Sequence, residues 1–235
     1  MTLAAPAKLT VSLRVTGVRG DGYHLVDAEM VSLDLADELV LTPGHGLEVV
    51  EGFDLGHVDP LDNLVGRALR AVGREAHVVL RKRIPAGGGL GGGSSNAAAV
   101  LRWAGCDDID VAVRLGADVP FCLRGGRARV TGIGEVLEPL PHQERTVTLA
   151  MPPYGCSTPA VYAAWDDLGG PVADGPNDLE PAALAVEPRL AAFRGALGDA
   201  TGETPRLAGS GSTWFVPGAF PGAGRIVARA VPAYW

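Results

Sequence analysis

The stretch from Pro85 to Leu101, PAGGGLGGGSSNAAAVL, constrains the fold most, because six of the seven residues at 87–93 are glycine. Glycine at that density cannot build a core, but its N–H groups are unobstructed by a Cβ and its φ can be positive. The SSN at 94–96 offers preferred N-caps, and residues 97–101 favour a helix. We predict a glycine loop leading into a helix N-terminus that binds phosphate, rather than a flexible linker.

The surroundings of this loop argue against three known phosphate loops. A Walker A loop requires GxxxxGK[ST], which the chain lacks. Gly87, Gly89 and Gly92 satisfy GxGxxG, but a run so rich in glycine satisfies many patterns by chance. A Rossmann loop also follows a buried apolar strand, whereas His77 to Arg83, HVVLRKR, is typical of a half-exposed strand. A protein-kinase loop is followed by a strand, and here a helix is expected.

Length and charge exclude several classes of protein. The 235 residues, 47% of them hydrophobic, are sufficient for one large or two modest domains. A net charge of −7 without a basic cluster argues against nucleic-acid or anionic-membrane partners. Three widely spaced cysteines predict neither a disulfide framework nor a zinc site. No apolar run of about twenty residues and no charged leader occur, so we expect a cytoplasmic protein.

The N-terminal third predicts strands. Residues from Ala5 to Thr16 alternate apolar and polar side chains from Lys8 onward, as in a strand with one wet face, where Lys8 would ordinarily be a surface lysine. GVRGDGYH at 17–24 is a turn-rich loop. The pattern at 27–42 predicts one strand, or two joined at 36–38, and Leu47 to Val50 predicts another. This hairpin content favours an α+β fold over a doubly wound sheet.

Helices are expected around the glycine loop. Leu64, with Asp62 as its cap, opens one helix, and two more are predicted at 95–103 and 110–115. Asp118, in LGADVPF, lies in a turn where a carboxylate usually stabilises the turn itself.

The last third predicts an apolar strand at 147–151, and a family resemblance implies a hairpin at 130–135 and a second glycine loop, LAGSGSTWFV, at 207–216. The polar break at 143–145 divides the chain into domains 1–143 and 144–235. The tail after the second loop is short, so we expect the last strand to be truncated or absent.

Together these segments identify a family resemblance. PAGGGLGGGSSNAAAVL resembles the second motif of the GHMP kinases, and its doubled triple glycine is most similar to their 4-diphosphocytidyl-2-C-methyl-D-erythritol kinases. APAK with GVRGDGYH resembles the first motif of these enzymes, LGADVPF their acidic motif, and LAGSGSTWFV their third motif. The resemblance implies a two-domain α+β fold, with a ribosomal-protein-S5-like N-terminal domain, a shortened ferredoxin-like C-terminal domain, and a cleft between them.

The resemblance also implies an ATP-dependent phosphorylation of the substrate 2-hydroxyl in non-mevalonate isoprenoid synthesis. It makes Asp118 the catalytic carboxylate and Lys8 its cationic partner, and it expects Mg²⁺ with Ser94 or Ser95 as a ligand. The ATP-binding residues it implies are Asn63, Pro85, Gly87, Gly88, Gly89, Leu90, Gly91, Gly92, Gly93, Ser94 and Ser95. The substrate-binding residues are Thr10, Tyr23, His24, Thr158, Tyr162, Gly209 and Gly211, with the two tyrosines on opposite faces of the cytosine.

Three departures from the family pattern leave alternatives open. Thr10 stands where the family usually has asparagine, the helix before Asp118 is shorter by a turn or two, and the C-terminus is clipped. A GHMP kinase for another small alcohol, such as homoserine or a mevalonate derivative, is one alternative. A non-catalytic member that binds a nucleotide or metabolite is the other. We expect a small-molecule substrate, no nucleic-acid or membrane partner, and a monomer or homodimer.

Overall fold

The computed structural model describes residues 1–50 and 63–233. Its strands are β1 (Thr2–Val18), β2 (His24–Thr42), β3 (Gly46–Val50), β4 (His77–Arg81), β5 (Arg127–Gly132), β6 (Val136–Pro139), β7 (Thr146–Ala150), β8 (Arg206–Leu207), β9 (Trp214–Pro217) and β10 (Arg225–Val231). Its helices are α1 (Leu64–Ala71), α2 (Gly92–Trp103), α3 (Ile109–Leu115), α4 (Val119–Arg124), α5 (Thr158–Asp167), α6 (Glu180–Val186) and α7 (Leu190–Thr201). The predicted α+β character is confirmed.

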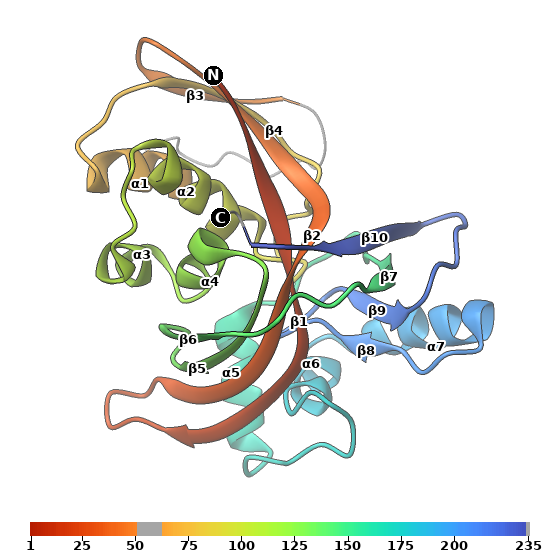
Figure 1. The fold of residues 1–235 in the computed structure, drawn as a ribbon. Coiled ribbons are helices and arrows are strands. Elements are labelled where there is room, and N and C mark those ends of the chain that lie inside the picture. Colours follow the sequence, from red (N-terminus) through yellow and green to blue (C-terminus); the bar gives the residue numbers. More distant parts are fainter. Residues whose placement is uncertain (51–62, 234–235) are drawn as a thin grey trace.

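The long antiparallel hairpin of β1 and β2 runs through the molecule (Figure 1). Helices α1 to α4 lie on one side of it, α5 and α6 lie beside the other half of the hairpin, and α7 lies along β8 and β9 (Figure 1). The strand is confirmed, but its predicted wet face is not, because Lys8 and Thr10 are buried along with Leu9. Leu9 and Leu13 belong to different parts of the core, and the pairing register shifts between them. The pairing of β1 with β2 shifts between Pro6 and Lys8. At this bulge the Lys8 amide bonds the carbonyl of Leu90 at 3.0 Å, which ties β1 to the glycine loop.

Strand β2 is a single continuous strand, so the possible join at 36–38 is not observed. Asp37, in the middle of that segment, is buried and pairs with Lys82. Its carboxylate also accepts the backbone amides of Arg83 at 2.7 Å and Ile84 at 2.8 Å. These bonds satisfy a carboxylate inside a strand, where burial would otherwise be costly, and they fix the chain that enters the glycine loop.

The sheet runs in the order β3-β4-β2-β10-β7-β9-β8, with β1 and β5 also paired to β2, and β6 paired to β5. The proposed boundary near residue 143 falls between β6 and β7. Strand β10 pairs with β7 and then with β2 through Ala230 and Val231. A last strand is present, because β10 has seven residues and joins the two parts of the sheet.

Candidate active site

The first glycine loop leads into α2 through a left-handed residue. Gly87, Gly89 and Gly91 have φ of 70°, 76° and 66°, a region that favours glycine. The helix begins at Gly92 with Gly91 as N-cap and no side-chain cap, so the prediction that residues 94–96 cap it is wrong. Among the described residues, the amides of Gly92, Gly93 and Ser94 have no hydrogen-bond partner. They are therefore available to an anion at the positive end of the helix.

The two serines after the loop are placed differently. Ser95 is fully buried, and its hydroxyl donates to the carbonyl of Pro6 at 2.6 Å. Its amide bonds the Gly91 carbonyl inside the helix at 2.8 Å. Neither group of Ser95 faces the loop, which contradicts its predicted roles in phosphate and metal binding. Ser94 is half-buried and lines the central cavity, so it keeps both candidate roles.

Asn63 begins the helix next to α2. Its Oδ1 accepts the amide of Val65 at 2.9 Å, so it is the N-cap of α1. A Cβ on Gly93 would lie 3.2 Å from Leu64 Cδ1, which places the start of α1 beside the start of α2. Asn63 therefore lies near the glycine loop while its side-chain oxygen is engaged. Asp62, the predicted cap, lies outside the described residues.

The second glycine loop packs directly against the first. A Cβ on Gly89 would overlap the Ala208 carbonyl oxygen and lie 2.7 Å from that of Gly211. The Thr213 amide bonds the Gly88 carbonyl at 3.1 Å. Only glycine at position 89 permits this approach, and the two loops brace each other.

Asn177, a buried residue before α6, holds the second loop in place. Its Nδ2 donates to the carbonyls of Leu207 at 2.9 Å and Gly209 at 2.7 Å, and its Oδ1 accepts the Leu179 amide. Both the NH₂ group and the oxygen of this side-chain amide are therefore bonded to the backbone. Asn177 was not among the predicted site residues.

Lys8 and Asp118 form an ion pair, with Lys8 Nζ 3.1 Å from Asp118 Oδ2. Lys8 is buried, and its Nζ also donates to Thr10 Oγ1 at 3.1 Å. The lysine stem passes close to Gly91, where a Cβ would lie 2.6 Å from Lys8 Cγ. A Cβ on Gly209 would lie 3.6 Å from Nζ. Lys8 is therefore not a surface lysine but lies where both glycine loops approach β1.

Asp118 precedes α4 without capping it. No side-chain hydrogen bond joins its carboxylate to the helix amides, so the usual turn-stabilising role does not apply. The turn is shaped by the β5–β6 hairpin, because a Cβ on Gly134 would overlap the Ala117 carbonyl. Burial, with a smaller effect from Asp118, raises the pKa of the nearby Cys122 thiol to about 12. Asp118 therefore lines the cavity as a carboxylate, and the nearby Cys122 thiol stays protonated.

A cavity of about 610 Å³ contains both members of this pair. It brings together most of the predicted substrate residues with Gly89 and Ser94 of the first loop: Thr10, Tyr23, His24, Thr158, Tyr162 and Gly209 line it. Gly211 does not line it, because its carbonyl is turned toward Gly89, so its prediction as a substrate contact is not supported by its position. Ser210, bonded to Thr158 at 2.9 Å between hydroxyl oxygens, lines the cavity and was not predicted.

The far end of the cavity is aromatic. The rings of His24 and Tyr162 lie 4.6 Å apart between centroids at 33°, and Trp165 meets His24 edge-on at 5.6 Å. Tyr23 is 59% exposed at the tip of the hairpin. Burial, with a smaller effect from Asp118, raises the pKa of Tyr162 to about 12, so this phenol remains a neutral donor. Asp166, which was not predicted, bonds His24 Nε2 through Oδ1 at 2.9 Å.

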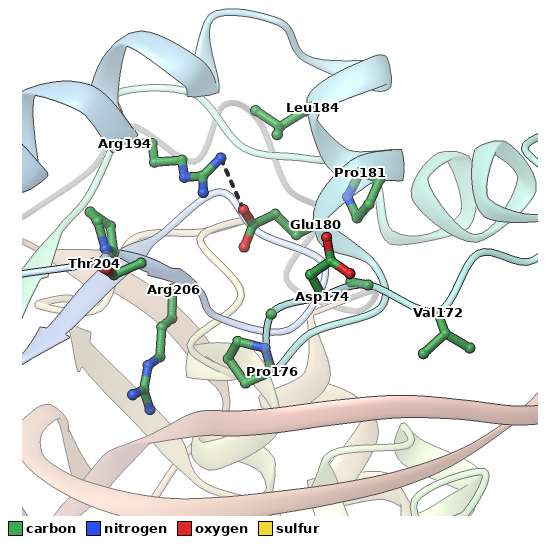
Figure 2. Close-up of a pocket in the computed structure, with 12 residues that line it drawn as sticks. Val172, Asp174, Pro176, Glu180, Pro181, Leu184, Arg194, Thr204 and Arg206 are labelled. Atoms are coloured by element: carbon green, nitrogen blue, oxygen red, sulfur yellow. Dashed lines mark ion pairs between the residues drawn. The ribbon is translucent and has the colours of Figure 1, made fainter.

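A second cavity, of about 560 Å³, lies between α6, α7, the loop at 172–176 and residues 204–206 at the start of β8 (Figure 2). None of the predicted site residues lines it. Its Glu180 is paired with Arg194 at 3.3 Å, as the dashed line marks (Figure 2). Burial raises the pKa of Glu180, and Arg194 opposes that change. The chemistry of the predicted motifs therefore gathers in the first cavity.

The described part of the chain holds no group of three or more His, Cys, Asp or Glu side chains arranged for a metal ion. Within residues 1–50 and 63–233, none of the helices combines the length and hydropathy needed to cross a bilayer.

Comparisons with known proteins agree with this geometry. Residues 63–126 match the model of the GHMP kinases N-terminal domain. The 4-diphosphocytidyl-2-C-methyl-D-erythritol kinase of Paracoccus denitrificans is 42% identical, over 90% of this chain and 85% of the relative. A crystal structure of 4-(cytidine 5'-diphospho)-2C-methyl-D-erythritol kinase superposes with a TM-score of 0.78 at 32% identity, covering 98% of this chain and 99% of that one.

A homoserine kinase from Cytophaga hutchinsonii superposes with a TM-score of 0.59 at 18% identity, covering 99% of this chain and 95% of that one, which shows a shared fold alone. The 42% identity to the Paracoccus denitrificans relative extends over most of both sequences and is far higher than the 18% identity to the homoserine kinase. On these grounds the chain belongs to the 4-diphosphocytidyl-2-C-methyl-D-erythritol kinase family, within the GHMP kinases.

Proposed function

We propose that this chain transfers the γ-phosphoryl group of ATP to the 2-hydroxyl of 4-diphosphocytidyl-2-C-methyl-D-erythritol, a step of non-mevalonate isoprenoid synthesis. The names of its relatives support the substrate. The observation that carries the chemistry is the Lys8–Asp118 pair, which lies in one cavity with Gly89 and Ser94 of the glycine loop. A non-catalytic binding module would not need a lysine and a carboxylate held together at that position.

Asp118 acts as the proton acceptor in this proposal. It takes the proton of the 2-hydroxyl while the oxygen attacks the γ-phosphorus, and the bond from that phosphorus to the β–γ bridging oxygen breaks to release ADP. Lys8 holds the Asp118 carboxylate through their ion pair and offsets negative charge that develops on the transferred group. The hydroxyl oxygen of Thr10 accepts a hydrogen bond from the ammonium of Lys8 and helps to hold it in place.

The free amides of Gly92, Gly93 and Ser94 bind the phosphates of ATP. The other residues of the loop, from Pro85 to Leu90, hold its shape, and Asn63 lies beside it at the start of α1. These donors fit a polyphosphate, because the loop's positive-φ glycines leave the backbone unobstructed.

We propose Mg²⁺ as the accompanying ion. A site without three clustered ligands among the described residues fits this ion, which commonly takes one or two protein ligands beside phosphate oxygens and water. Ser94 lines the cavity next to the glycine loop, so its hydroxyl is the side-chain group suited to hold the ion. The ion would neutralise phosphate charge.

The aromatic end of the cavity binds the base. Tyr23 and Tyr162 supply ring faces for the cytosine, and His24 supplies a polar group for its edge. Thr158 and Gly209 line the same cavity, with Gly209 close to Lys8, and contact the rest of the acceptor. We also propose two lobes at 1–143 and 144–235, a monomer or homodimer, and a cytoplasmic location, which the three free cysteines support.

The test is ATP turnover with a panel of acceptors: the cytidine compound, its uridine analogue, methylerythritol without a nucleotide, homoserine and mevalonate. We expect the highest kcat/KM for the cytidine compound. Replacing cytosine by uracil exchanges a donor for an acceptor at a polar site and should cost about tenfold or more. Equal values for all acceptors would point to a kinase of another small alcohol, and turnover of none would leave a binding module.

A further inference from the structure

The residue that contacts His24 most directly from outside the predicted site is Asp166, in the last turn of α5. Its Oδ1 lies 2.9 Å from His24 Nε2. The His24 side chain is 11% exposed and that of Asp166 is 48% exposed, so the histidine is held in the cavity wall and the carboxylate supports it from the surface. Both residues line the same cavity.

The ring of His24 is fixed on its other sides by aromatic contacts. Tyr162, four residues before Asp166 on α5, stacks on it at 4.6 Å, and Trp165 meets it edge-on at 5.6 Å. One helix therefore supplies the face, the edge and the hydrogen-bond partner of a residue on β2. This arrangement leaves the imidazole one orientation with Nε2 toward the carboxylate.

The chemistry of the partner then determines where the proton is. An ionised carboxylate only accepts hydrogen bonds, so Nε2 must carry the proton in this contact. In the neutral ring Nδ1 is then an acceptor. An acceptor matches the exocyclic amino group at C4 of cytosine, whereas the carbonyl oxygen at C4 of uracil would face it lone pair to lone pair.

We propose that Asp166 is a positioning residue that fixes the Nε2–H tautomer and the orientation of His24 and thereby sets the preference for a cytosine over a uracil base. This inference rests on the proposed function, because it takes the aromatic end of the cavity as the site of the acceptor's base. It adds a residue of α5 to the determinants of specificity.

The neighbouring Asp167 provides a matched control. It is exposed on the same helix, and its side chain has no hydrogen bond or ion pair with any of the described residues. Asp166→Asn and Asp167→Asn therefore make the same change of charge one residue apart. An asparagine at 166 can still bond Nε2, but through either its oxygen or its NH₂ group, so it no longer selects the tautomer.

The first measurement is binding of cytidine diphosphate and uridine diphosphate by calorimetry, which requires no turnover. In Asp166→Asn we expect the preference for the cytidine ligand to fall by about three- to tenfold, the scale of one hydrogen bond, with ATP affinity unchanged. Asp167→Asn should keep the wild-type preference. An unchanged preference in Asp166→Asn, or a wild type that binds neither diphosphate, would overturn the inference.

The second measurement reads the tautomer itself. Nitrogen-15 NMR of the imidazoles, with the His24 signals assigned by their loss in His24→Gln, should give the Nε2–H form in the wild type and in Asp167→Asn, and a mixture in Asp166→Asn. If Asp166 had a merely structural role, the tautomer of His24 would be the same in Asp166→Asn as in the wild type, and that result would overturn the proposal. If turnover of the cytidine compound fails while both of these results hold, the proposed reaction falls and the role of Asp166 stands.

Discussion

The two glycine loops at the centre of the molecule are held in different ways. The first is fixed from outside through its carbonyls: Gly87 accepts from Cys156, Gly88 from Thr213 and Leu90 from Lys8. The second is tied largely to itself, with Gly211 bonded to Ala208 and Ala208 to Thr213. Asn177 then clamps two of its carbonyls from the side.

This difference separates a binding loop from a supporting one. The carbonyls of the first loop accept hydrogen bonds that anchor it, while the amides at the start of α2 stay free, which suits the loop to an anionic ligand. The second keeps its own shape and can therefore fix the position of the first. Lys8 runs past both loops, so it should be the residue most sensitive to their relative placement.

The largest effect is expected where the loops meet. Lys8→Ala and Asp118→Asn should each lower kcat by at least about a hundredfold, because each removes a proton-transfer or charge-stabilising group. Circular dichroism should show a folded protein in both. Steady-state turnover of the cytidine compound is the measurement, and a rate near that of the wild type in either variant would contradict the assignment.

Changing the first loop alone should come next. Gly91→Val places a Cβ only 2.6 Å from Lys8 Cγ, at a residue whose φ is +66°. Backbone strain of about 1–2 kcal/mol and the contact together should weaken ATP binding by at least about tenfold, measured by calorimetry. Gly73→Val is the control, since Gly73 has a φ of +61° with no atom within 4 Å. It should lose stability but keep its ATP affinity, and equal ATP affinity in both variants would reduce the first loop to a linker.

Loosening the second loop should act on stability first. Asn177→Ala leaves two buried carbonyls without their donor and should lower the free energy of unfolding by about 1–3 kcal/mol. Urea denaturation measures this change. Asn177→Asp should be worse, because it turns an acceptor toward two carbonyls. Were the aspartate variant as stable as the wild type, the clamp would not be what holds the loop.

The smallest effect is expected at Thr10. Thr10→Val removes the hydroxyl that accepts from Lys8 Nζ but keeps the shape of the side chain, and should lower kcat about two- to tenfold. Thr10→Ser keeps the hydroxyl and should retain most of the activity. A valine variant with full kcat would show that Asp118 alone positions Lys8.

Sequence alone predicted much of this architecture because its signals are local. The strand β1, the helix after the glycines and the helix α3 all follow from neighbouring residues, whereas the β5–β6 hairpin was implied by the family resemblance. The start of α2 was predicted wrongly, because Ser95 and Asn96 resemble caps while the backbone of Gly91 makes the turn. The contact that buries Ser95 comes from Pro6, 89 residues earlier.

The site was predictable only where a family motif marks it. The buried role of Asp37 has no local signal, because its partners lie 45 to 47 residues further along the chain. Asp166 had a signal in its spacing, because it follows Tyr162 by four residues on one helix and so shares its face. Nothing near it in sequence identifies His24, 142 residues away, as its partner.

The position of β10 has a consequence for how the chain matures. Among the described strands it is synthesised last, yet it lies between β2 and β7 in the sheet. The N-terminal hairpin and the strands around β7 can each form beforehand, but they stay unjoined along this edge until residues 225–231 arrive. Assembly of the sheet therefore depends on pairing across about 200 residues, a separation that slows folding and leaves the edges of β2 and β7 exposed to wrong partners during synthesis.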